Sequence, residues 1–190
     1  LVPKKGLVHL LDAMPAVLAQ RPAVMLSIAG FGPEEAALKA QAARLGITAH
    51  VSFPGAMAQA ELPALYRRAS LFVAPFIRDD SGNQEGLPVV LMEAIGCGCP
   101  VLVGEVAGIV DLLGDARADV CVKPGDTQAL AIAIIGLLRN PEQARQRAIA
   151  IRATAADRID WQNISDGYAR ELQQCIVTRI PRHRETSDSP

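Results

Sequence analysis

The sequence predicts an α/β protein with an open parallel sheet that is covered by helices on both faces. Short apolar segments alternate along the chain with longer segments in which apolar residues recur at helical spacing. Glycine or proline stands at most of the boundaries between them. Strands that alternate with helices pair in parallel through right-handed crossovers, and these crossovers place helices on both faces of the sheet. A chain of 190 residues is long enough to give such a fold a full hydrophobic core.

The first predicted elements are a helix, a buried strand and a second helix. Apolar residues recur at helical spacing over residues 7–21, where Pro15 is a point at which the helix can kink or break. Residues 23–29 form a nearly continuous apolar run that ends at Gly30, as expected of a strand buried on both faces. The helix predicted over residues 33–46 begins with proline and two acids and ends with glycine.

The same alternation continues to the end of the chain. The further predicted elements are helices over 59–70 and 87–96, strands over 50–53, 71–75 and 100–104, a weaker strand over 119–123, a long helix over 127–139, and helical segments that begin near Pro141 and Trp161. After residue 180 the chain has no large apolar side chain. We therefore predict one domain over residues 1–178 and a disordered tail over residues 179–190.

The composition excludes several functional classes. Lys and Arg (19) nearly balance Asp and Glu (20), so no overall positive charge favours nucleic acid or an acidic membrane surface as the main partner. The apolar runs fall well short of the roughly 18 residues that a membrane span needs. The four cysteines form no pair of CxxC motifs, so we predict no metal site and reduced thiols in a cytoplasmic compartment. Leu1 is not an initiator, and we expect the chain to be a piece of a longer one.

Residues 30–35 (GFGPEE) follow a predicted strand and open a helix, as a dinucleotide-binding fingerprint does. The third glycine of the fingerprint is replaced by Glu35, and the carboxylates of Glu34 and Glu35 would repel a pyrophosphate. We therefore expect neither a nicotinamide nor a flavin cofactor.

The stretch QEGLPVVLME, residues 84–93, carries the main functional signal. Glu85 lies in a loop after a predicted strand, Pro88 stands in the first turn of the next helix, and Glu93 lies inside that helix. The free backbone N–H groups of a helix N-terminus bind phosphate or diphosphate. A diphosphate bound there would direct its two substituents toward the two glutamates, and a carboxylate can accept two hydrogen bonds from a vicinal diol. A nucleotide sugar has this layout of sugar, diphosphate and ribose.

The segment from Glu85 to Glu93 resembles the E-x7-E motif of the family 4 retaining glycosyltransferases. Further blocks resemble that family in the same order, over about residues 1–175: KKGL, SIAGFGPEE, VSFPG, ELPALYRRA, EGLPVVLMEAIGCGCPVL, PVLVGEVAGIVDLL, VKPGD and a late helix containing Trp161. The resemblance implies a Rossmann-like domain that forms the C-terminal half of a two-domain GT-B enzyme. Such an enzyme transfers a sugar from a nucleoside diphosphate sugar to an acceptor hydroxyl with retention and without a metal ion.

The resemblance also implies roles for residues in and around the motif. Glu85 would be the catalytic residue that faces the donor sugar near its anomeric carbon. Glu93 would bind the ribose hydroxyls. The backbone N–H groups of Gly86, Leu87 and Val89 would surround the sugar and the phosphates.

Lys5 would neutralise the diphosphate leaving group, and Gly30, Phe53 and Gly55 would lie in the loops that receive the nucleotide base. Two alternatives remain open for single residues: Lys5 as a solvated charge and Glu85 as a cap of the following helix.

The implied partners are a nucleotide sugar, a missing amino-terminal acceptor domain, and an acceptor sugar or glycolipid in polysaccharide biosynthesis. Peripheral membrane association of the full-length enzyme is compatible with this role. We expect the present chain alone to bind donor weakly and to transfer little. A sugar-nucleotide epimerase of the same fold and a non-enzymatic α/β regulatory module remain alternatives.

Overall fold

The computed structural model describes residues 1–179 of the chain. These residues belong to two units, a compact one that comprises Leu1–Ala155 and a second one that begins at Ala156. The predicted disordered tail falls outside the described residues, apart from Arg179, which ends a helix. Within residues 1–179, no helix is both long and apolar enough to cross a bilayer.

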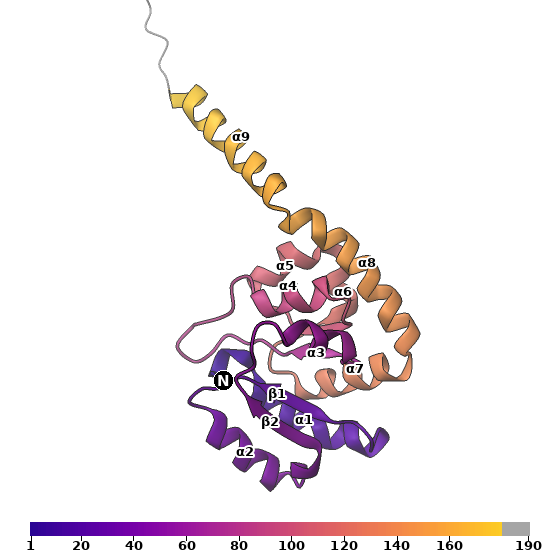
Figure 1. Ribbon diagram of the computed structural model, residues 1–190. Coiled ribbons are helices and arrows are strands. Elements are labelled where there is room, and N and C mark those ends of the chain that lie inside the picture. The colour runs from indigo at the N-terminus through magenta and orange to yellow at the C-terminus, as the bar shows by residue number, and fades with distance from the viewer. Residues whose placement is uncertain (180–190) are drawn as a thin grey trace, which may run out of the picture. The chain divides into compact units, whose positions relative to one another are not determined.

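Parallel strands alternate with helices along the first unit (Figure 1). In chain order the elements are η1 (Pro3–Lys5), α1 (Leu7–Gln20), β1 (Leu26–Ala29), α2 (Glu35–Arg44), η2 (Thr48–His50), β2 (Val51–Gly55), α3 (Leu62–Arg68), β3 (Phe72–Ala74), α4 (Val89–Gly96), β4 (Val101–Gly104), α5 (Ala107–Leu113), η3 (Gly114–Ala116), α6 (Arg117–Val120), β5 (Cys121–Val122), α7 (Thr127–Arg139) and α8 (Pro141–Ile159). The last element, α9 (Trp161–Arg179), belongs to the second unit.

All the strand pairs are parallel, which confirms the predicted fold class. β1 pairs with β2, and β4 lies between β3 and β5, so that the described strands form two parallel sheets. Helices lie on both sides of these sheets (Figure 1), with α1 packed against α2 and α7, and α3 packed against α4. The predicted strands are therefore present, and their backbone hydrogen bonds divide them into two groups.

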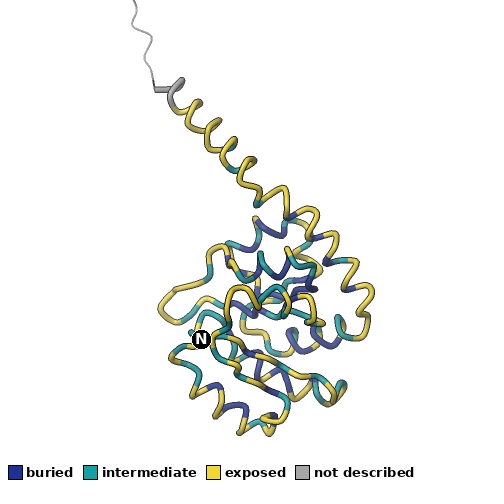
Figure 2. The backbone as a smooth tube through the Cα atoms, in the orientation of Figure 1, coloured by how far each residue is buried: buried dark blue, intermediate teal, exposed yellow. Residues whose placement is uncertain are grey.

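Helix α1 joins the two groups through their hydrophobic cores. Leu10 and Val17 pack into a cluster with residues of β4 and α7, whereas Leu11 and Met14 pack into a second cluster with residues of β1 and α2. Figure 2 shows these buried stretches along α1 and α7. Because burying a leucine side chain contributes about 1.5–3 kcal/mol, this shared helix holds the two sheets together. α1 continues through Pro15, which the sequence marked as a point of bending.

The structure differs from the sequence predictions mainly at element boundaries. α4 begins at Val89 instead of Leu87, because a residue that precedes proline avoids the helical conformation, and Pro88 itself is extended with ψ 115°. The short helices α5 and α6 were not predicted, since segments of one or two turns show too little periodicity. Each boundary shift is small, so the loops still lie at the carboxyl ends of the strands.

The second unit contains the end of α8 and the whole of α9. Asp160 caps α9, since its Oδ1 atom accepts hydrogen bonds from the backbone N–H groups of Gln162 and Asn163. Trp161 and Tyr168 are exposed large side chains of this helix.

Candidate functional site

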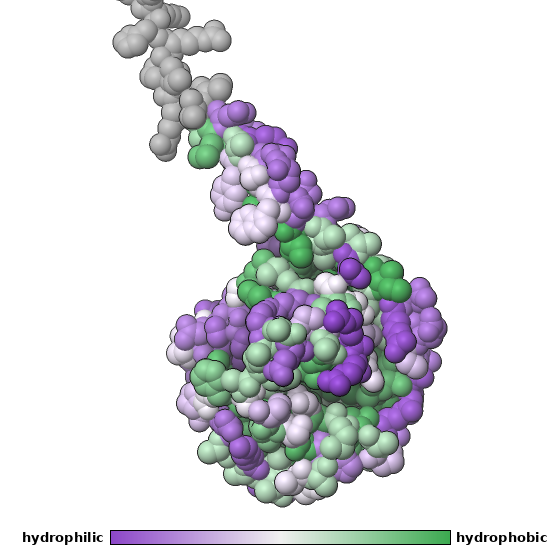
Figure 3. All heavy atoms as spheres, viewed as in Figure 1, coloured by the Kyte–Doolittle hydropathy of each residue, from purple (hydrophilic) through white to green (hydrophobic). Residues whose placement is uncertain are grey.

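The loop that connects β3 to α4 lies against β4 and α5 because two glycines allow it. A Cβ atom on Gly104 would overlap the backbone of Phe76, and a Cβ atom on Gly108 would overlap the backbone of Gly86. The need for these two glycines could not be predicted from the sequence, although both stand in the block that follows the motif. Figure 3 shows a largely hydrophilic surface over this loop. The loop is therefore held at the carboxyl end of the sheet, where ligands of such folds bind.

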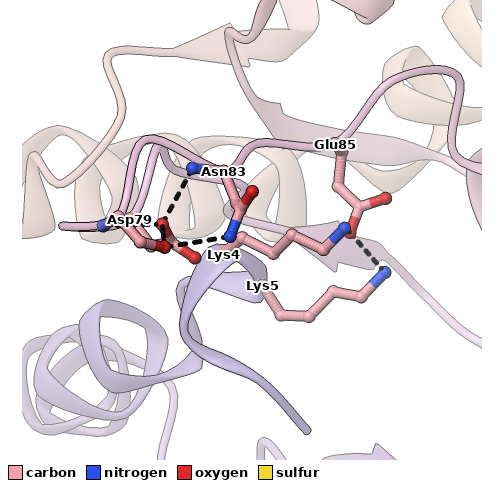
Figure 4. A network of polar contacts seen from close by, with 6 residues as sticks. Lys4, Lys5, Asp79, Asn83 and Glu85 are labelled. Atoms are coloured by element: carbon pink, nitrogen blue, oxygen red, sulfur yellow. Dashed lines mark hydrogen bonds and ion pairs between the residues drawn. The ribbon is translucent and has the colours of Figure 1, made fainter.

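Glu85 is brought together with the predicted Lys5 and with Lys4. The Glu85 Oε1 atom lies 2.9 Å from Lys5 Nζ and 3.3 Å from Lys4 Nζ, and Figure 4 shows both lysine side chains extending toward it. The Oε1 atom is buried. The two ammonium groups are close enough to it to form ion pairs, but they are not aligned with it as hydrogen-bond donors. Lys5 also lies 5.3 Å from the centre of the Phe76 ring. Lys5 is thus held against Glu85, in contrast to the alternative of a purely solvated charge.

The charge of Glu85 follows from two opposing effects. Burial raises the pKa of the Glu85 carboxyl group, but the ion pairs with Lys5 and Lys4 lower it by more, so that the net pKa lies below the ordinary value of 4.5. Glu85 is therefore an anion at neutral pH. It carries a single negative charge between two positive ones.

The two lysines are positioned by the backbone that precedes α1. The backbone N–H of Ile77 donates a hydrogen bond to the Lys4 carbonyl at 3.0 Å. Gly6 adopts a φ of 66°, and a Cβ atom at this residue would overlap the Pro75 carbonyl. The glycine of the KKG sequence therefore lets the chain turn closely against the end of β3.

Asp79 organises the middle of the loop. Its Oδ1 atom accepts hydrogen bonds from the backbone N–H groups of Ser81 (3.0 Å) and Asn83 (2.9 Å) and from the Ser81 hydroxyl (2.7 Å). The hydrogen bond from the Ser81 hydroxyl is the main reason that the pKa of Asp79 lies below its ordinary value. Among residues 1–179 no group of three or more His, Cys, Asp or Glu residues could hold a metal ion. Metal independence itself stays a prediction.

The N-terminus of α4 presents backbone N–H groups without a side-chain cap. Pro88 is the N-cap residue, and no side chain accepts a hydrogen bond from the first turn, so Glu85 does not cap the helix. Gly86 is exposed, and so are Leu87 (51%) and Val89 (60%) despite their apolar side chains. The three residues whose N–H groups were predicted to bind a ligand therefore lie at the surface.

Glu93 lies one helical turn after Val89 and hence on the same face of α4. Its Oε2 atom accepts a hydrogen bond from the Tyr66 hydroxyl at 3.1 Å, and its Oε1 atom accepts one from Gln59 Nε2 at 2.5 Å. Neither partner could be predicted from the sequence, because spacing along the chain shows neither which face of α3 meets α4 nor where the segment before α3 lies. The carboxylate therefore has a defined orientation.

Gly30 and Gly55 meet at the carboxyl ends of β1 and β2. The backbone N–H of Gly30 donates a hydrogen bond to the Gly55 carbonyl at 2.7 Å, and both glycines have positive φ values (117° and 79°). Phe53 packs partly into the core, with Lys39 Nζ 5.5 Å from its ring centre. The two loops therefore lie side by side and the ring of Phe53 is partly buried, while their role in receiving the nucleotide base stays a prediction.

Taken together, the fold and this site define a class of protein. Parallel α/β domains that expose a helix N-terminus at the carboxyl edge of their strands, beside fixed lysines, bind phosphorylated ligands. The chain belongs to the family of glycosyl transferases group 1, whose model matches residues 1–154. This assignment confirms the predicted family and, with the solved structures below, the GT-B class of the domain.

Two curated mannosyltransferases are similar to the chain. It is 34% identical over 162 residues to the GDP-mannose-dependent alpha-(1-6)-phosphatidylinositol monomannoside mannosyltransferase of Mycolicibacterium smegmatis. It is 36% identical over 168 residues to the phosphatidyl-myo-inositol mannosyltransferase of Mycobacterium leprae. The matches cover 85% and 88% of this chain but 42% of each relative. The chain thus spans less than half the length of these relatives.

Solved glycosyltransferase structures have the same fold. HepE of Anabaena in complex with UDP superposes with a TM-score of 0.76 at 28% identity, over 92% of this chain and 46% of HepE. HepE in complex with UDP-glucose gives a TM-score of 0.75 at 28% identity, with the same coverage. TarM of S. aureus, at 18% identity and a TM-score of 0.78 over 90% of this chain and 33% of TarM, supports the fold alone.

Proposed function

We propose that this domain binds the nucleotide sugar donor of a retaining glycosyltransferase. The observation that carries the proposal is the arrangement around α4: Glu85 is fixed by two lysines at one end, an uncapped helix N-terminus follows, and Glu93 lies one turn further along. Family membership supports glycosyl transfer over a regulatory module or an epimerase. In the full-length protein an amino-terminal domain would supply the acceptor site.

The diphosphate would bind between Lys5 and the N-terminus of α4. Its negative charge would be stabilised by the Lys5 ammonium group and by the N–H groups of Gly86, Leu87 and Val89. The same groups would stabilise the nucleoside diphosphate as it leaves the sugar, when its charge increases. Glu85 would then face the donor sugar near its anomeric carbon.

The ribose and the base would bind on the other side of the diphosphate. Glu93 offers a charged acceptor for the vicinal hydroxyls of the ribose. Gly30, Phe53 and Gly55 would line the site of the base, where the hydrogen bond between the two glycines fixes the loops. The GDP-mannose-dependent relative and the UDP-bound neighbour make GDP and UDP the nucleotides to test.

Further features of the proposal come from the family resemblance. Transfer would proceed without a metal ion or a cofactor, and the acceptor would be a sugar or a glycolipid. The free thiols of Cys97, Cys99 and Cys121 support a cytoplasmic location of the domain. This domain alone would bind donor and transfer little, because the acceptor site belongs to the rest of the protein.

The test is a calorimetric titration of the 190-residue chain with UDP and with GDP. Glu93→Ala removes up to two charge-assisted hydrogen bonds to ribose, each worth about 1.5–3 kcal/mol, so we expect at least about a tenfold loss of affinity. Glu142→Ala is the control, because Glu142 is a helical acid that accepts a hydrogen bond from a glutamine, as Glu93 does, but it lies exposed on α8. An unchanged affinity of the Glu93→Ala variant would show that the ribose assignment is wrong.

A further inference from the structure

The two oxygen atoms of Glu93 have partners of opposite character. Tyr66, which donates to Oε2, is only 6% exposed. Gln59, which donates to Oε1, is exposed and lies in the segment between β2 and α3. One oxygen therefore faces the protein interior, and the other faces a side chain that solvent can replace.

Tyr66 is fixed by its surroundings. Its ring packs edge-on against Phe72 of β3, with 5.7 Å between the ring centres and an interplanar angle of 77°. Burial, followed by the negative charge of Glu93, raises the pKa of the Tyr66 hydroxyl, so this group stays protonated. A protonated phenol beside a carboxylate can act only as the donor, which orients the carboxylate plane.

Gln59 has the chemistry of a ligand hydroxyl at the opposite oxygen. Its amide N–H donates a hydrogen bond to the carboxylate as a sugar hydroxyl would. An exposed glutamine loses rotamer freedom when it holds one position, so its net contribution is small. A vicinal diol that donates two hydrogen bonds from one preorganised group is the stronger partner.

We propose that Tyr66 is a positioning residue that orients Glu93 for ribose recognition, and that Gln59 occupies the ribose-facing oxygen until the nucleotide displaces it. This inference rests on the proposed function, because it assigns the ligand of Glu93 as a ribose with both hydroxyls. It extends the site beyond α4 to α3 and to the segment that precedes it. The two partners then have opposite effects on affinity.

The experiment compares Tyr66→Phe and Gln59→Ala in calorimetric titrations of the 190-residue chain. The ligands are whichever of UDP and GDP binds more tightly, and the 2′,3′-dideoxy analogue of that nucleotide. We expect Tyr66→Phe to lower the affinity for the ribonucleotide about three- to tenfold, since Glu93 loses the hydrogen bond that holds its carboxylate in one orientation and must be ordered on binding. The dideoxy analogue should bind the variant and the parent chain nearly equally.

Gln59→Ala should keep or raise the affinity for the ribonucleotide by up to a few fold, because the competing donor is removed. Since Gln59 is exposed, this variant should fold even if Tyr66→Phe does not. Tyr168→Phe is the control for tyrosine substitution, since Tyr168 is an exposed residue of α9. A clear loss of ribonucleotide affinity in Gln59→Ala would overturn the proposed displacement.

The outcomes separate this inference from the proposed function. If Glu93→Ala weakens binding and Tyr66→Phe weakens the ribonucleotide and the dideoxy analogue equally, Tyr66 has only a structural role and the inference is wrong. If neither Glu93→Ala nor Tyr66→Phe changes the affinity, the ribose site itself is wrong.

Discussion

At the scale of single residues, the site depends on how carboxylates are paired. Glu85 is ion-paired with two lysines, whereas Glu93 accepts hydrogen bonds from uncharged groups. A phosphorylated ligand would compete with Glu85 for Lys5, and a hydroxyl would compete with Gln59 for Glu93. The two motif glutamates therefore have different electrostatic tasks although they share a residue type.

The pairing of Glu85 predicts a pH dependence of stability. Because its pKa is lowered in the folded state, its ion pairs stabilise the fold fully above the ordinary pKa of 4.5, and this contribution is lost as the pH falls through the lower folded pKa. The free energy of unfolding should therefore fall less on acidification in Glu85→Gln than in the parent chain. Urea denaturation at about pH 3 and about pH 7 measures this difference.

Glu142→Gln provides the comparison, since Glu142 is an exposed acid of α8. If the unfolding free energies of Glu85→Gln and the parent chain differed by the same amount at both pH values, the assigned ion pairs would be contradicted.

The sequence predicted several residues of the site but not the contacts that they make. Glu85, Glu93 and Lys5 follow from the motif and from its resemblance to a family. Tyr66 could not be predicted as a partner of Glu93, because the two residues are 27 positions apart and meet only through the packing of α3 on α4. The ion pair between Lys4 and Glu85 could not be predicted either, because these two residues are also far apart in the sequence.

At the scale of elements, the position of the β3–α4 loop depends on glycines outside it. Gly108 of α5 lies so close to Gly86 that a side chain at residue 108 must displace the backbone. Gly108→Ala should therefore lower stability by about 1–3 kcal/mol and weaken nucleotide binding, because the N–H groups of the loop would move. Thermal unfolding and calorimetric titration of the same variant measure the two effects.

Gly136→Ala is the matched control for Gly108→Ala. Gly136 lies inside α7, and a Cβ atom there would meet nothing within 4 Å, so alanine should stabilise the helix by up to about 1 kcal/mol. If Gly108→Ala behaved like Gly136→Ala, the close packing of α5 on the loop would not hold the site.

Strands and long helices were predictable because their apolar pattern is long enough to read. The short elements η3, α5 and α6 were not, since they follow one another directly and none of them is longer than two turns. The division of the strands into two sheets also escaped prediction. Pairing depends on contacts between distant segments, and the chain pattern gives only the alternation of strand and helix.

At the scale of the whole molecule, α1 connects the two halves of the site. The sheet of β1 and β2 carries the glycine loops, and the sheet of β3, β4 and β5 carries the glutamate loop and α4. Both sheets pack against α1 through separate clusters of its residues. Because the chain spans 42% of the length of each of the two mannosyltransferases, transfer is an activity to be tested in a full-length protein.

The central claim is that the loop and the N-terminus of α4 bind a nucleoside diphosphate. The most direct measurement is a nuclear magnetic resonance titration of the isotope-labelled chain with UDP and GDP, which follows each backbone amide. The account predicts the largest shifts at Gly86, Leu87 and Val89. The account would be contradicted by shifts that are largest at the hollow between α6, α7 and α8, which is lined by Asp119 and Arg147, with none at α4.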